Sequence, residues 1–133
     1  MIQLQELRIG NCVRSYSKND LIFTVKCLND TFAEIEHVDK DGTIYNSSVD
    51  YENLIPIPLT EEILLKFRYK KIRDNEFLFD NHFIIFIKES EIDFCLYNSE
   101  GNDFFVCEIQ FAHELQNLHF SIRKEELKFK DIS

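Results

Sequence analysis

The feature that most constrains this chain is a short run, residues 83–87, in which every position is apolar. The run reads Phe-Ile-Ile-Phe-Ile, which is typical of a strand buried on both faces and is far too short to cross a membrane. Such a strand needs neighbours within a sheet and a layer of structure on each side. The natural cover in this sequence is a helix predicted at residues 112–123.

The sequence around this run predicts a helix, four strands and a closing helix. Thr60 is a good N-cap for a helix whose apolar face consists of Ile63, Leu64 and Phe67. The strands are predicted at residues 72–79, 83–88, 91–97 and 103–110. The apolar stripe of the closing helix consists of Phe111, Ala112, Leu115, Leu118 and Ile122. We therefore expect a four-stranded antiparallel meander flanked by two helices.

The first part of the chain shows period-two alternation in short runs, which predicts an all-β lobe. Strands are predicted at residues 9–16, 21–28, 31–38 and 43–47, with turns at Asn29-Asp30 and Asp41-Gly42. A single helical turn at residues 51–54 and an extended segment at residues 55–58 follow. This order suggests a small five-stranded barrel of the Src-homology-3 type. A simple antiparallel meander packed on the second half is nearly as well supported.

The two prolines of the chain, Pro56 and Pro58, mark the best candidate boundary, because each forces the preceding residue toward an extended conformation. We therefore predict an N-terminal β lobe at residues 1–58 and a C-terminal α+β lobe at residues 59–133, packed as one unit. The predicted fold class is α+β.

Composition narrows the class of protein without identifying a function. The 133 residues are 44% hydrophobic and 29% charged, with a formal net charge of −9, which describes an acidic globular chain and not a disordered one. The start of the chain does not read as a secretory signal and the four cysteines form no C-x-x-C pair, so we expect a cytoplasmic protein with reduced thiols. No phosphate-binding glycine loop or G-x-S-x-G motif is present, and no cofactor is expected.

Three segments carry a resemblance: ELRIGN at residues 6–11, IPLTEEILLKF at residues 57–67 and HELQNLHFSI at residues 113–122. In the same order, and over nearly the whole chain, they resemble a family of small uncharacterised proteins of Bacteroidales and their phages or mobile elements. The chain departs from that pattern at Cys12, where an aromatic residue is common, and at Arg123-Lys124, which replace a Thr-Gly pair. The resemblance implies a setting, an accessory protein of a mobile element, and no particular activity.

An apolar ring on a polar helix face is the first candidate site. On the closing helix Phe120 points toward the side that carries His113, Gln116 and Asn117. A contact with the first lobe or with the tail at residues 127–130 would explain the ring, and a partner-binding patch is the alternative. The function we favour is a non-enzymatic accessory protein that binds another macromolecule, with a protein as the expected partner.

A small enzyme with a Cys/His site is a second hypothesis. Cys107 near the end of one strand and His113 in the first turn of the following helix could meet in space. Cys107, however, alternates in phase with Phe105, Ile109 and Phe111, and a thiol on the buried face of a strand is usually inert. An enzyme is therefore the less favoured reading.

A single-stranded nucleic-acid binding module is a third hypothesis, since cations and an aromatic residue cluster after the first helix. The residues are Lys66, Arg68, Tyr69, Lys70, Lys71 and Arg73. The net charge of −9 opposes this reading, because a phosphate backbone would be repelled at long range. A solvated helix end is the simpler interpretation.

No metal site is predicted. Residues 37–42 superficially resemble a calcium loop, but His37 stands at the first ligand position and Ser48 at the twelfth, so a hairpin turn is expected there. His113 and His119 are six positions apart, which separates them around a helix. His119 falls inside the apolar stripe and is expected to be a hydrogen-bonded core residue.

Overall fold

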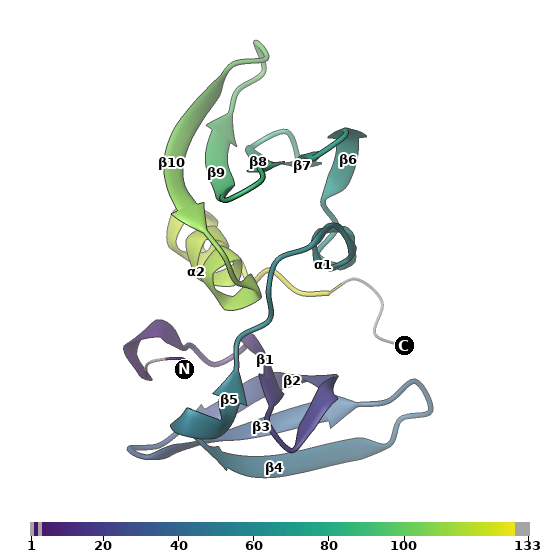
Figure 1. The fold of residues 1–133 in the computed structure, drawn as a ribbon, viewed down its shortest axis with the longest axis vertical. Coiled ribbons are helices and arrows are strands. Elements are labelled where there is room, and N and C mark those ends of the chain that lie inside the picture. The colour runs from purple at the N-terminus through teal and green to yellow at the C-terminus, as the bar shows by residue number, and fades with distance from the viewer. Residues whose placement is uncertain (1, 3, 130–133) are drawn as a thin grey trace. The chain divides into compact units, whose positions relative to one another are not determined.

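The computed structural model describes residues 2 and 4–129 (Figure 1). Within these residues the chain forms two five-stranded antiparallel sheets and two α-helices, so the predicted mixture of helices and antiparallel sheets is confirmed. The chain divides into two compact units. The first takes in the described residues up to Pro58 and from Phe111 onward, and the second is Leu59–Gln110. The chain thus leaves the first unit after Pro58 and returns to it, whereas the sequence analysis kept residues 59–133 together.

The first unit is built on a sheet with the strand order β4-β3-β2-β1-β5 (Figure 1). After a short 3₁₀ turn, η1 (Leu4–Glu6), its strands are β1 (Cys12–Ser15), β2 (Lys18–Leu28), β3 (Phe32–Val38), β4 (Ile44–Asp50) and β5 (Leu54–Ile55). The single helical turn predicted before the last strand is present as η2 (Tyr51–Asn53). In the described residues β4 and β5 are the two edges of an open sheet, so the predicted barrel is not closed.

The predicted alternation places the core on one face of this sheet. Buried positions on β2 and β3 are Phe23, Val25, Ala33 and Ile35. Lys26 and Glu34, which lie between them in the sequence, are exposed. Successive side chains of a strand point to opposite faces, so this pattern confirms a sheet with one buried face.

The second unit is a helix followed by a sheet in which each strand pairs with the next one along the chain. Its elements are α1 (Glu61–Lys66), β6 (Lys70–Arg73), β7 (Glu76–Phe79), β8 (Phe83–Ile87), β9 (Ile92–Tyr97) and β10 (Asp103–Ile109). Thr60 caps α1 as predicted, because its hydroxyl Oγ1 accepts a hydrogen bond from the backbone N–H of Ile63 at 3.3 Å.

The second sheet has five strands, where four were predicted. The difference arises because the predicted strand at residues 72–79 is in fact a hairpin, β6 and β7, that turns at Asp74 and Asn75. Asn75 has a φ of 62°, and asparagine tolerates this left-handed conformation better than most residues. Asp74-Asn75 is therefore a turn signal that the sequence analysis placed inside a strand.

The apolar run at residues 83–87 forms β8, the third strand of the five. Phe83, Ile84 and Ile85 are all buried, although successive residues point to opposite faces of the sheet. The prediction of a central strand buried on both faces is confirmed for these three residues. On one face the ring of Phe83 packs against that of Phe94, with 5.2 Å between their centroids.

The closing helix, α2 (Ala112–Arg123), has the predicted bounds but belongs to the first unit. The backbone N–H of Ala112 donates to the carbonyl of Ile57 at 2.8 Å. The buried residues of α2 are Ala112, His113, Leu115, Gln116 and His119. The predicted apolar stripe is wrong at Ile122, which is exposed, because polar residues with partners in the first unit take up part of the buried face.

In the described part of the chain neither helix is both long and apolar enough to span a membrane.

Candidate binding surface

The side chain of Gln116 joins α2 to two other segments of the first unit. Its Oε1 accepts a hydrogen bond from the backbone N–H of Cys12 at 2.7 Å. Its Nε2 donates to the carbonyl of Gly10 at 3.1 Å and to that of Leu127 at 2.9 Å. Gln116 is fully buried, so these contacts replace the water that its amide would otherwise need.

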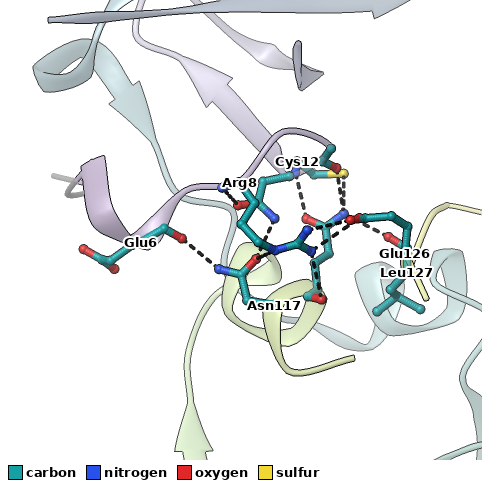
Figure 2. Close-up of polar contacts among 9 residues, drawn as sticks. Glu6, Arg8, Cys12, Asn117, Glu126 and Leu127 are labelled. Atoms are coloured by element: carbon teal, nitrogen blue, oxygen red, sulfur yellow. Dashed lines mark hydrogen bonds and ion pairs between the residues drawn. The ribbon is translucent and has the colours of Figure 1, made fainter. Parts of the chain in front are cut away.

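Asn117 makes a second set of contacts to the segment before β1 (Figure 2). Its Nδ2 donates to the carbonyl of Glu6 at 2.8 Å. Its Oδ1 accepts from Nε of Arg8 at 3.0 Å and from Nδ2 of Asn11 at 2.9 Å. The polar face of α2 is therefore tied to the N-terminal segment of its own chain.

Arg8 completes this arrangement and covers the ring that the sequence singled out. Its guanidinium lies 4.2 Å from the centroid of Phe120, a cation–π geometry. The same guanidinium forms an ion pair with Glu126 at 2.5 Å. Phe120 therefore contacts the N-terminal segment, which is one of the two intramolecular explanations that the sequence offered. Of the tail at residues 127–130, residue 130 lies outside the described residues.

The four predicted binding residues thus differ in their accessibility. His113 and Gln116 are buried, and Asn117 is used in the network. Phe120 alone of the four is exposed, and one face of its ring lies against Arg8. This face of α2 offers a partner little free surface.

The Cys/His pair does not come together as a site within either unit. Cys107 lies on β10 in the second unit and is half-buried, whereas His113 lies on α2 in the first. The Nε2 of His113 is 3.5 Å from Oε1 of Glu6, which is also in the first unit. Two of the other thiols are buried, and burial raises the pKa of Cys12 to about 12 and that of Cys95 to about 11.

The basic segment after α1 lacks the stacking surface that a nucleic acid would need. Tyr69 is buried, with its ring centroid 5.1 Å from that of Phe79. Three of the cations face carboxylates of the same unit: Lys66 with Glu62, Lys71 with Glu61, and Arg73 with Glu76. Three ion-paired cations and a buried ring favour a solvated helix end over a single-strand binding site.

Residues 37–42 contain the end of β3 and the predicted hairpin turn, which leads into β4 at Ile44. The backbone N–H of Asp39 donates to the carbonyl of Thr43 at 2.8 Å, which closes the loop. In the described residues, no group of three His, Cys, Asp or Glu side chains is arranged to hold a metal ion.

A surface that the sequence analysis missed lies on β10, at the edge of the second sheet (Figure 1). Three consecutive large apolar residues are exposed there: Phe104 by 55%, Phe105 by 61% and Val106 by 41%. Leu96, opposite Phe104 on β9, is 38% exposed. Natural edge strands rarely show such a run, because an exposed apolar edge invites pairing with another chain.

The register of β10 explains why Phe105 does not lie on the face that the alternation of the sequence predicts. Phe105 pairs with Cys95 and Cys107 pairs with Phe94, so Val106 is an extra residue in a β-bulge. The bulge shifts the alternation, and Phe105 and Cys107 point to opposite faces of the sheet. The alternation in the sequence predicts that these two residues share one buried face, and this prediction is wrong. Adjacent Phe104, Phe105 and Val106 in the last strand of a meander were the available signal.

Carboxylates gather beside this edge. Asp93 on β9 pairs with Glu108 on β10, and its Oδ2 forms an ion pair with Nζ of Lys88 at 2.6 Å. This hydrogen bond holds the pKa of Asp93 below its usual value. The pKa of Glu91 is raised, mainly by its hydrogen bond with Asp93 and further by the charge of Glu108. The end of the β9–β10 ladder is therefore electronegative.

Comparisons of the chain with protein-family models, with curated proteins and with solved structures give no match. What the protein does has to be inferred from its own surface.

Proposed function

We propose that this is a non-enzymatic accessory protein that binds another protein through the edge of β10. The observation that carries the proposal is the run of three exposed apolar residues, Phe104, Phe105 and Val106, on an edge strand. Their burial against a partner would contribute on the order of 5 kcal/mol of transfer free energy. An added strand would also form hydrogen bonds with the backbone N–H and C=O groups of β10 that face away from β9.

Two further elements of the proposal concern fold and setting. We propose that the first sheet is a small open barrel of the Src-homology-3 type, an interpretation supported by its strand order and by η2 before β5. The resemblance of residues 6–11, 57–67 and 113–122 supports an accessory protein of a phage or mobile element of Bacteroidales. Neither element defines the partner, because small barrels serve many functions.

The test is co-purification from the cells in which the gene occurs, with three baits: the wild type, Phe105→Lys and Ile72→Lys. Ile72 is the matched control, because it is a partly exposed apolar residue on β6, the opposite edge of the same sheet. Both variants should keep the circular dichroism spectrum and melting temperature of the wild type. We expect a protein retained in near-equal amounts by the wild type and by Ile72→Lys and lost with Phe105→Lys.

Retention of that protein by Phe105→Lys would contradict the proposal. So would an empty result from a folded wild-type bait.

A further inference from the structure

The side chains on one face of β10 have a charge pattern that indicates which partner strand could pair with this edge. Asp103, Phe105 and Glu108 pair across the ladder with Tyr97, Cys95 and Asp93, in that order. These three partners alternate along β9 and therefore share one face of the sheet. The bulge at Val106 thus brings Asp103, Phe105 and Glu108 into one row, in which a carboxylate stands on each side of an aromatic ring.

The opposite face of the same edge is apolar. Phe104 lies across from Leu96, and both side chains are exposed. A strand added to β10 would therefore place apolar side chains beside Phe104 on this face. On the other face it would meet the ring of Phe105 between two acids.

A second copy of this chain fits the edge poorly. If β10 paired antiparallel with itself about Phe105, Asp103 of each copy would lie opposite Glu108 of the other. Like charges directly opposite each other in a sheet are destabilising. Charged edge residues and bulges are also the devices by which proteins prevent edge-to-edge association. The formal net charge of −9 adds repulsion at longer range.

A partner strand with basic residues fits it well. Lysine or arginine opposite Asp103 and Glu108 would form two cross-strand ion pairs around an apolar contact with Phe105. The raised pKa of Glu91, caused first by Asp93 and further by Glu108, indicates that the nearby field is negative. Lys88 forms an ion pair with Asp93, which lies opposite Glu108 in the ladder.

We propose that the β10 edge binds an extended segment of a partner protein in which two basic residues flank an apolar residue on one face, with apolar residues on the other face. This inference rests on the proposed function and specifies the chemistry of the partner.

The experiment uses the full chain and three dye-labelled, capped peptides. The first is Thr-Lys-Val-Val-Ile-Lys-Thr, and the other two replace both lysines by glutamine or by glutamate. Fluorescence anisotropy at low and high salt measures their dissociation constants. We expect the lysine peptide to bind about tenfold more tightly than the glutamate peptide, with a difference that shrinks as salt is added.

A variant that neutralises both carboxylates tests whether the preference for the lysine peptide comes from Asp103 and Glu108. Asp103→Asn with Glu108→Gln should reduce the difference between the lysine and glutamate peptides to about twofold. The matched control is Glu62→Gln with Asp74→Asn, which removes the same charge from exposed positions of the same unit. The control should leave the preference unchanged.

Equal binding of all three peptides, or binding of none, would overturn this assignment of the partner's chemistry. The co-purification with Phe105→Lys would still decide separately whether the edge binds a protein at all. Sedimentation of the wild type adds a further check, since a dimer that Phe105→Lys dissociates would make a second copy the occupant and overturn the proposal.

Discussion

The two edges of the second sheet differ in length and in the residues that they expose. β6 is a strand of four residues that carries Lys70, Lys71 and Arg73, with its apolar residue Ile72 at a register shift. β10 is a strand of seven residues, in which Phe104 and Phe105 are both more than half exposed. Short strands rich in lysine are the usual protection of a sheet edge.

This comparison shows that the same sheet is protected on one side and open on the other. Both edges carry an irregular register, so the bulge alone does not explain the difference. What distinguishes β10 is the exposure of aromatic rings beside two acids. The acids of such an edge would repel those of a second copy, while its apolar area remains accessible to a partner of opposite charge.

The largest expected effect separates the interior of the second sheet from its open edge. Phe94 is fully buried on β9, next to β10. Phe94→Ala should lower the free energy of unfolding by about 4 kcal/mol, because it leaves a cavity in the core. Phe105→Ala should lower it by less than about 1 kcal/mol. Urea denaturation followed by circular dichroism measures both values, and similar losses would show that Phe105 is a core residue.

The next effect sharpens the role of the acids on β10. Asp103→Lys removes one carboxylate and creates a cation that can face Glu108 of a second copy. We expect this variant to form dimers at concentrations at which the wild type is monomeric, because antiparallel pairing would then join opposite charges. Sedimentation velocity over a concentration series measures this. Asp74→Lys, in the β6–β7 turn, is the control and should stay monomeric.

Thiol reactivity distinguishes β10 from its neighbour β9. Cys107 is half-buried, whereas Cys95 is buried and its pKa is raised to about 11, chiefly by that burial. A thiol-specific reagent at neutral pH should therefore label Cys107 at least about tenfold faster than Cys95. A Cys27→Ser background removes the other half-buried thiol, and mass spectrometry of digests identifies the labelled site. Complete protection of Cys107 until denaturation would contradict the exposure described for this strand.

The smallest effect concerns acid stability beside the open edge. The hydrogen bond from Lys88 lowers the pKa of Asp93 below the usual value of an aspartate, so the ionised form is favoured in the folded state. The stability contributed by this pair is present above that value and is lost as the pH falls through the lower native pKa. Lys88→Met should flatten this loss in urea titrations at acid pH. An unchanged slope would indicate that Lys88 does not set the charge of Asp93.

Much of the fold could be predicted from local patterns. The bounds of α2 follow from a strong helical period, and β2 and β3 follow from alternation around short turns. The hairpin at Asp74 was missed because two charged residues within an otherwise strand-like segment give a weak turn signal. The unit to which α2 belongs could not be predicted from neighbouring residues. It depends on hydrogen bonds between Gln116 and residues more than a hundred positions away.

The candidate surface was harder to predict than the fold. The polar residues beside Phe120 resembled an exposed patch, but a buried polar network and an exposed polar face have the same pattern in a sequence. On β10 one extra residue, Val106, changed which side chains face the core. The position of a bulge depends on pairing with a neighbouring strand, so alternation alone places Phe105 on the wrong face.

The most direct measurement is hydrogen–deuterium exchange of the full chain with and without a saturating amount of Thr-Lys-Val-Val-Ile-Lys-Thr. Backbone amides that gain a partner strand exchange more slowly. We expect new protection in β10, at Asp103–Ile109, and none in β6, at Lys70–Arg73. Protection centred on β6 or on α2, or no change in β10 despite measured binding, would contradict the proposal.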